Sequence, residues 1–214
     1  MEYLEISTGN IRSQGEIRKL HKNMSLPRVF TDDVCTALNI TPILATPKPE
    51  ASSLLKQYVR DGVTTDALGN TVQAWVEVDK FSDTEDKTKA EQESEYLETL
   101  KEQKRQEMKD NRNMLINGDF ATTVPSGGYM IDCDQYARSN LHQAIDNAEI
   151  AGLTDADTTT WKMADNNFYT ISYGELKLMG LQIAQYINQQ FAHEATKNAE
   201  IDAASIATIM GVTW

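Results

Sequence analysis

The chain has few aromatic residues and no long apolar run. Aromatic residues make up 7% of its 214 residues and hydrophobic residues of all kinds make up 40%, which is lean for one large core. No apolar stretch approaches the ~20 residues that a transmembrane helix needs, so we expect no membrane insertion. The N-terminal stretch MEYLEISTGNIRSQ has neither a basic nor an apolar region, and we therefore predict no secretory signal.

Positive charge is also scarce. Lys and Arg together number 20 against 32 Asp and Glu, which leaves a formal net charge of −12. Proteins that bind nucleic acid without sequence specificity neutralise phosphates with clustered Lys and Arg, so we expect no nucleic-acid partner. An acidic chain of this kind is either kept soluble by self-repulsion or docks on a basic partner.

Only two cysteines are present, Cys35 and Cys133, and they lie far apart in the sequence. Neither belongs to a CxxC pair, and no histidine follows at a ligand spacing. Two free thiols in a reducing compartment are therefore favoured over a disulfide or a metal site.

Motifs that carry catalysis are missing as well. The sequence has no GxxxxGK[ST], GxGxxG after a strand, GxSxG or HExxH, and the two glycines after Pro125, Gly127 and Gly128, suit a hairpin turn better than a phosphate cradle.

The three histidines stand in separate segments, which favours surface positions over a ligand set. The C-terminal aspartates lie at strand ends, turns and helix caps, where local hydrogen bonding explains them, and their spacing fits no calcium loop. We predict no catalytic site, no cofactor and no metal, and thus a protein that is not an enzyme; a glycan hydrolase is the weakest alternative because no pair of carboxylates marks a cleft. The histidines are His21, His142 and His193, and the aspartates are Asp132, Asp134, Asp155, Asp157 and Asp165.

Residues 1–81 predict a small β-rich domain. A short strand (YLEIS), a turn at Gly9 and a brief helix over 14–22 open it, and four prolines then favour extended chain over the next thirty residues. TPILATPKP predicts an edge strand. LLKQYVRDGVTT and TVQAWVEVDKF flank DALGN, which is a hairpin pattern with glycine in the turn.

Residues 82–112 predict a long polar connector helix. Ser82 and Glu85 form a capping-box pattern, and the interior is rich in Glu, Lys, Gln and Ala. The apolar residues form only a thin stripe, and lysines interrupt the heptads that a coiled coil would sustain. A solvated spacer and an oligomer seam that contacts a partner or further copies of the chain both remain open. The candidate seam residues are Ala90, Leu97, Leu100 and Met108.

Residues 113–214 predict a compact module of two β-hairpins packed on two or three helices, so the whole chain is expected to be α+β. MLINGDFATTV and GYMIDCD are read as one hairpin across PSGG, and TTTWKM and FYTI as the other across ADNN. Asp134 is expected to cap a helix that Gly152 ends, and Ser172 with Glu175 to open a second helix, before a last short helix over AEIDAASIATIM. Trp161 is interpreted as a core anchor rather than a ligand platform. The predicted core is Leu141, Trp161, Ile171, Leu176 and Ile183.

These segments also resemble proteins of tailed bacteriophages. TWKMADNNFYTISYGELKLMGLQIAQYI is similar to the W-[KR]-x-A-D-N…[LI]-[ST]-x-x-E-L signature of a C-terminal domain of unknown function, common in phage proteins encoded beside tail fibres. RNMLINGDFATTVPSGGYMIDCDQYARSNLHQAI resembles the first hairpin and helix of that domain. Its aromatic-x-hydrophobic-Asp-x-Asp run into the helix matches Tyr129, Ile131, Asp132, Asp134, Arg138 and Leu141.

The N-terminal part looks like a second phage module. STGNIRSQGEIRKLHKNMSLP is similar to a TG…EIR…NPN.SFP segment, TPKPE to a T-P-x-P segment, and TVQAWVEVDKF to an x-x-Q-x-W-x-V-x-D strand. The loop over 21–27 departs from that pattern, because it lacks the first NP and the Phe.

The resemblance implies a setting rather than a mechanism. It leads us to expect a structural component of the phage tail, associated with the tail fibre or baseplate, that binds other tail proteins; the alternative is a tail-fibre assembly chaperone. The chain would be made and assembled in the host bacterial cytoplasm and reside in the virion, where the resemblance implies a trimer if the stripe on the long helix self-associates.

Overall fold

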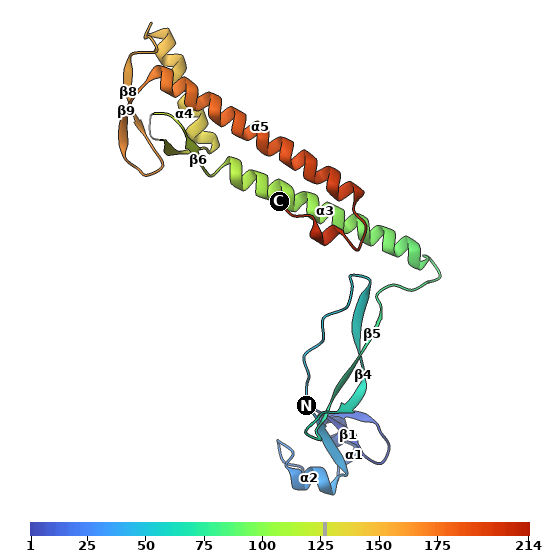
Figure 1. Cartoon of the computed structure of the whole chain (residues 1–214). Helices are drawn as coiled ribbons and strands as arrows, with labels where there is room; N and C mark the ends of the chain where they lie inside the picture. The colour runs from blue at the N-terminus through green and yellow to red at the C-terminus, as the bar shows by residue number, and fades with distance from the viewer. Residues whose placement is uncertain (126–127) are drawn as a thin grey trace. The chain divides into compact units, whose positions relative to one another are not determined.

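A computed structural model describes residues 1–125 and 128–214 and shows an α+β protein (Figure 1), as the sequence predicts. The predicted turn residue Gly127 lies outside the described residues. The chain divides into two compact units, Met1–Glu93 and Ser94–Trp214, in place of three segments. Most of the long helix therefore belongs to the C-terminal unit.

The N-terminal unit is built mainly of strands. Its elements are β1 (Glu2–Glu5), β2 (Ile11–Ser13), α1 (Gln14–Leu20), α2 (Asp32–Ala37), β3 (Ile40–Ile43), β4 (Lys56–Thr65) and β5 (Thr71–Asp79). Strands β2, β1 and β3 form an antiparallel sheet in that order, so β3 is the edge strand that the prolines predict. Ser13 and Glu16 form a capping box that starts α1.

A small core fills this unit. Tyr3, Ile17, Phe30, Cys35 and Ile40 pack together. Cys35 and Val34 come from α2, where the sequence predicted extended chain. No proline interrupts Asp32–Ala37, so burial of one helical face there outweighs the extended preference of the flanking prolines.

Strands β4 and β5 form the predicted hairpin, a long two-stranded ribbon. The chain before β4 runs beside β5: the amide of Leu44 donates to the Thr71 carbonyl, and the indole Nε1 of Trp75 donates to Thr46 Oγ1 at 2.9 Å. Of the valines at alternating positions in β5, Val72 is buried, whereas Val76 is 39% exposed, so this face of the ribbon is only partly covered.

The end of β5 carries an aspartate held by two lysines. Lys56 Nζ lies 2.5 Å from one carboxylate oxygen of Asp79, and Lys89 Nζ lies 2.7 Å from the other. These hydrogen bonds lower the pKa of Asp79 from 3.8 to about 2. Because the folded state depresses this pKa, the pairs stabilise the unit above pH 3.8 and lose their contribution as the pH falls toward 2.

We predict that the Asp79 carboxyl titrates near pH 2 when its chemical shift is followed by NMR. Replacing both partners (Lys56→Met and Lys89→Met) should raise that midpoint toward 3.8, whereas Lys48→Met, remote from the carboxylate, should leave it unchanged. An unmodified chain whose Asp79 already titrates near 3.8 contradicts the pairing.

The long helix α3 spans Lys89–Ile116 and starts later than predicted. Both Ser82–Glu85 and Thr88–Glu91 match the capping pattern, and the structure uses the second: Thr88 Oγ1 accepts from the Glu91 amide, and the Glu91 carboxylate accepts from the Thr88 amide. Asp83 accepts a further hydrogen bond from the Lys89 amide at 2.6 Å. A main-chain bond to Asp83 and a side-chain bond to Asp79 thus hold Lys89 at the start of the helix that follows the second cap.

The remaining elements complete the C-terminal unit. They are β6 (Asp119–Thr122), β7 (Tyr129–Asp132), α4 (Gln135–Ile150), β8 (Thr158–Lys162), β9 (Phe168–Ser172), α5 (Tyr173–Ala203) and the 3-10 turn η1 (Ile209–Gly211). The two hairpins, the Asp134 cap, Gly152 at the end of α4 (φ 70) and the Ser172–Glu175 capping box are all present as predicted. Residues 114–116, expected in a strand, extend α3, and residues 199–203 extend α5.

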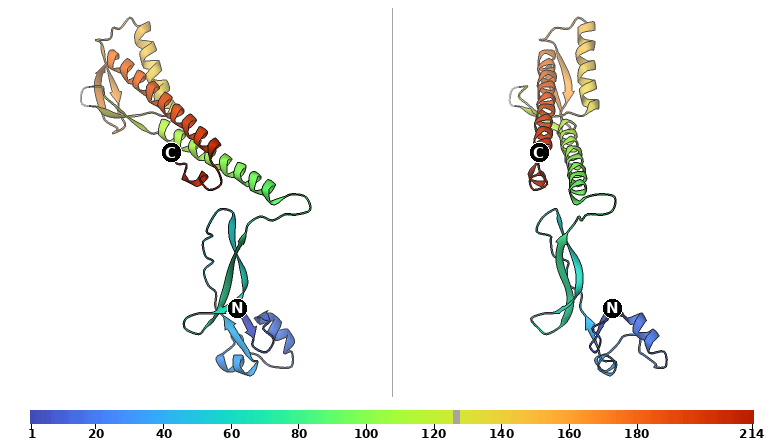
Figure 2. Two further views of the ribbon diagram at one scale, coloured as in Figure 1. Left: turned by 45° about the vertical axis from the view of Figure 1, so that its right-hand side comes forward. Right: turned by 90° about the vertical axis from the view of Figure 1, so that its right-hand side faces the viewer.

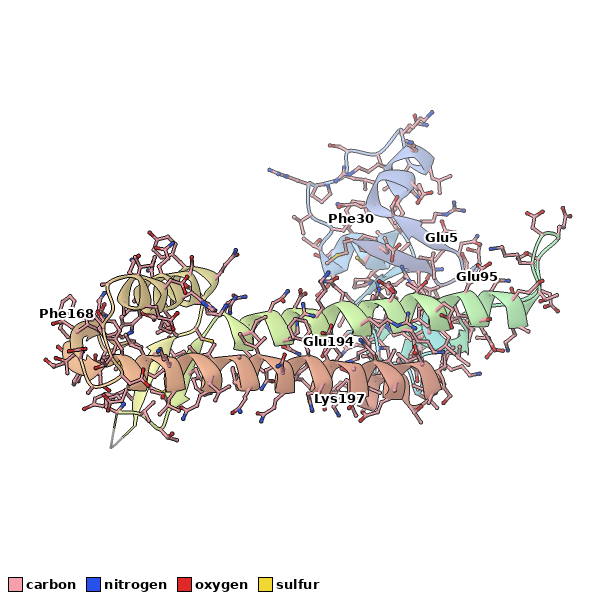
Figure 3. All side chains as sticks on the ribbon, turned by 90° about the horizontal axis from the view of Figure 1, so that it is seen from above. Glu5, Phe30, Glu95, Phe168, Glu194 and Lys197 are labelled. Carbon is pink, nitrogen blue, oxygen red and sulfur yellow. The ribbon has the colours of Figure 1, made fainter. Side chains whose placement is uncertain are left out.

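Helices α3 and α5 lie side by side in antiparallel orientation, as both views in Figure 2 show. Arg105 pairs with Asp202, Arg112 with Glu194, and the Tyr186 hydroxyl approaches the Leu115 carbonyl at 3.5 Å. Figure 3 shows Glu194 on the side of α5 that faces α3. The long helix is therefore half of an intramolecular helix pair rather than a free spacer.

This packing corrects the seam expected on the long helix. Leu100 and Met108 are buried within the C-terminal unit, Leu97 is half-buried and Ala90 is exposed. Ile201, Ile209 and Val212 are also buried, and Asp202, which follows Ile201, pairs with Arg105 of α3, so the end of α5 lies against the long helix. Most of the apolar residues that were expected to contact other copies of the chain are therefore buried within the fold.

A groove between β8 and α4

The second hairpin and α4 enclose a groove of about 420 Å³. That volume lies in the range of small-ligand and peptide pockets. Its lining comes from β7, α4, β8, β9 and α5, and consists of Ile131, Asp132, Asp134, Tyr136, Ala137, Asn140, Leu141, Thr160, Trp161, Lys162, Phe168, Met179 and Ile183.

The floor of the groove is the core of the C-terminal unit. Ile131, Leu141, Met179 and Ile183 are buried there, and the same residues belong to the apolar cluster that includes Ile171 and Leu176. Asp134 positions the wall formed by α4, since its carboxylate accepts from the Ala137 amide at 2.7 Å and starts the helix there. The groove is therefore backed by packed side chains and is preformed.

Aromatic side chains mark its rim. Tyr136 is 77% exposed and Phe168 is 69% exposed, and Figure 3 shows Phe168 at the end of the unit beside α4. Trp161 also lines the groove and packs half-buried against the core. Exposed aromatics clustered at a pocket mark binding surfaces, because they contribute large contact areas at a low entropic cost.

The charges of the groove are unequal. Over the described residues, the lining includes two carboxylates, Asp132 and Asp134, and one cation, Lys162. The neighbouring aspartates are used by the fold: Asp157 binds Thr154, Asp165 binds Asn167 and Tyr169, and Asp155 pairs with Lys177. Over residues 1–125 and 128–214, the Asp132 carboxylate makes no such bond, so it is available to a ligand.

The backbone of β8 has an open edge along the groove. In an antiparallel pair, hydrogen-bonded and non-hydrogen-bonded residue pairs alternate. Met163 donates to Asn167 and Tyr173 donates to Asp157, which makes the odd-numbered residues of β8 the ones bonded to β9. The N–H and C=O groups of Thr160 and Lys162 therefore point away from β9, toward the groove.

The opposite edge belongs to β7. The Cys133 amide donates to the Gly118 carbonyl, so in the β6–β7 pair Ile131 is bonded to Phe120, and the main-chain groups of Met130 and Asp132 point outward. Among the described residues, one main-chain hydrogen bond joins the two hairpins, from the Ala164 amide to the Met130 carbonyl at 3.0 Å. Beyond that bond the strands separate, and the groove lies where they diverge.

The charged side chains that line the groove over the described residues are Asp132, Asp134 and Lys162. Across the described part of the chain, no group of three or more His, Cys, Asp or Glu side chains gathers to hold a metal ion. Cys133 lies under the groove but is fully buried, and burial raises the pKa of its thiol, which disfavours the reactive thiolate. Among the same residues, none of the helices combines the length and apolar character required to cross a bilayer.

The structure brings all five predicted core residues together. Leu141, Ile171, Leu176 and Ile183 are buried in one cluster, and Trp161 packs against it. Trp161 also lines the groove, so it belongs both to the core packing and to the wall of the groove. Tyr136, in the first turn of α4, is exposed at the rim of the groove.

Sequence reasoning missed Tyr136 and Phe168 as binding residues. The available signals were the alternation of β9, which sets Phe168 on the face opposite Ile171, and the position of Tyr136 in the first turn of α4. The sequence analysis gives Asp132 the same structural role as the other aspartates. Over the described residues, it differs from the neighbouring aspartates in that its carboxylate makes no hydrogen bond or ion pair.

A family comparison covers this part of the chain. Residues 99–212 match the model of a family described as a domain of unknown function, DUF4376. The chain belongs to the DUF4376 family. No curated protein and no solved structure matches the chain.

The DUF4376 match begins at Thr99 within α3 and ends at Val212. It therefore contains most of the α3–α5 pair and the whole groove, and it lies within the C-terminal unit Ser94–Trp214. The family boundary agrees with assigning the long helix to this unit rather than to a separate connector.

Proposed function

We propose that this protein is a structural component of a bacteriophage tail, associated with the tail fibre or baseplate, and that it binds other tail proteins. The observation that carries the proposal is the pair of phage-module resemblances, in residues 7–81 and 112–187, which follow each other in the order usual for such proteins. The DUF4376 domain supplies a surface suited to the role, because its groove offers apolar, aromatic and hydrogen-bonding groups together.

The proposed partner is a protein rather than nucleic acid. The net charge of −12 opposes binding to phosphates, whereas exposed aromatics beside a preformed groove suit a protein partner. The chain would act without catalysis or a cofactor, and it would reside in the tail of the virion after synthesis in the bacterial cytoplasm.

Mass spectrometry of purified virions tests this proposal. We expect the chain at a fixed stoichiometry with the tail-fibre or baseplate proteins, and a deletion of its gene should yield particles with defective tails. A chain that is needed for fibre assembly but is missing from finished virions would support the alternative, a tail-fibre assembly chaperone. A chain that is absent from virions and dispensable for infectivity would contradict both roles.

A further inference from the structure

We propose that the groove binds an extended basic segment of a partner protein, which adds as a strand to the open edge of β8. This inference rests on the proposed function only in taking the partner to be a protein. The segment would pair with the main chain of Thr160 and Lys162, place alternate apolar side chains on the floor, and direct a basic side chain to Asp132 and Asp134.

The main-chain geometry favours a peptide over other ligands. Thr160 and Lys162 each offer an outward N–H and C=O on one strand edge, the spacing with which a neighbouring strand forms its ladder. A strand edge beside a helix leaves space for one extended chain. A sugar or a small aromatic molecule would use the rim rings but would leave these repeating donors and acceptors unused.

The floor and rim suit the two faces of such a strand. Side chains of an added strand alternate between opposite faces, so every second residue would point toward Ile131, Leu141 and Ile183 and bury apolar surface. Tyr136 and Phe168 lie exposed at the rim, where they can cover the segment once it is bound.

The carboxylates on the β7 side of the groove would attract a positively charged side chain of the partner. Asp119 and Asp132 are directly opposed in the β6–β7 register. Their position between the bonded pairs at Cys133 and Ile131 makes them a non-hydrogen-bonded pair, in which side chains lie closest. Like charges opposed in this way repel each other, and Asp134 adds a third carboxylate nearby. A lysine or arginine of the bound segment would relieve this repulsion.

A peptide-binding measurement on the purified full chain tests the proposal. The probes are synthetic hexapeptides that alternate valine or leucine with lysine or arginine, a matched set with glutamate in place of the basic residues, and N-methylated copies of the basic set. We expect the basic set to bind, the acidic set to bind at least about tenfold more weakly, and N-methylation to remove binding, because it blocks the main-chain hydrogen bonds.

Two proline variants test whether the main-chain N–H groups on the open edge of β8 contribute to peptide binding. Thr160→Pro removes an outward N–H on the groove side, whereas Thr170→Pro removes the corresponding outward N–H on the far edge of the same hairpin. Proline is tolerated at edge positions whose N–H is not bonded within the sheet, so both variants should fold, as circular dichroism can verify. We expect Thr160→Pro to weaken binding by about tenfold or more and Thr170→Pro to change it by less than about twofold.

Two charge-reversal variants test whether the carboxylate of the groove selects basic peptides. Asp132→Lys should abolish the preference for basic peptides, while Asp146→Lys, on α4 outside the groove, should preserve it. Equal binding of methylated and unmethylated peptides, equal effects of the two proline variants, or binding of oligosaccharides with none of the peptides would each overturn the proposal. The assay needs no virion, so its failure leaves the mass-spectrometric test of the tail role unaffected, and the reverse also holds.

Discussion

Replacing Met108 by alanine should destabilise the C-terminal unit by about 2–5 kcal/mol, the range for truncating a buried methionine. Met108 is 0% exposed and lies on the side of α3 that faces α5. Its removal would leave a cavity inside the C-terminal unit, and a cavity that the surrounding side chains fill only partly adds to the cost of the lost burial. Chemical denaturation followed by circular dichroism measures the loss.

Met114→Ala is the matched control, because Met114 belongs to the same helix but is 67% exposed. Its effect should lie within about 0.5 kcal/mol of zero, as for surface substitutions in general. A neutral Met108→Ala that changes the oligomeric state in light scattering would contradict the intramolecular pairing and restore the seam between copies of the chain.

Replacing Arg112 by alanine should cost about 3 kcal/mol, the lower end of the range for breaking a buried ion pair. Arg112 and Glu194 lie 2.5 Å apart with 13% of each side chain exposed. The guanidinium also lies 4.5 Å from the centre of the Phe191 ring and donates to the Asn113 side chain. The alanine variant therefore leaves the Glu194 carboxylate without its cation in a site with little water.

Arg105→Ala serves as the comparison, because the Arg105–Asp202 pair joins the same two helices at an exposed position, with side-chain exposures of 34% and 63%. Exposed pairs are screened by solvent and contribute about 0–1 kcal/mol. The double variant Arg112→Ala/Glu194→Ala should recover part of the loss of Arg112→Ala, since no charge is then left alone. Equal costs for Arg105→Ala and Arg112→Ala would show that burial does not distinguish the two pairs.

Local signals in the sequence predicted the elements of the C-terminal unit well. The Asp134 cap, the Ser172–Glu175 capping box and the turn at Gly152 each depend on residues within three or four positions of each other, so the pattern contains all the information needed. The hairpins are similarly local, because a short turn brings both strands together.

The same local reasoning was wrong where two equivalent signals competed. The start of α3 could not be chosen between Ser82 and Thr88, because both have a glutamate three residues later, and bonds from Lys89 to Asp79 and Asp83 decide it. The sequence analysis did not predict helix α2, because its stability comes from burying Cys35 against Tyr3 and Phe30. Tyr3 lies far from α2 in the sequence, so the local residue pattern does not reveal this contact.

By itself, the sequence determined the α+β class, the caps of α4 and α5, the hairpins, and the residues that form the C-terminal core, since these follow from short-range periodicity and turn chemistry. Only the tertiary structure decided that α3 pairs with α5, because Lys101 and Arg105 of α3 bond to Asp202, which lies 101 and 97 positions later in the sequence. It also decided the groove, because over the described residues one main-chain hydrogen bond, from Ala164 to Met130, joins the two hairpins before their strands diverge. That divergence exposes a strand edge beside Asp132 and Trp161, and no pattern within either hairpin encodes the space between the two.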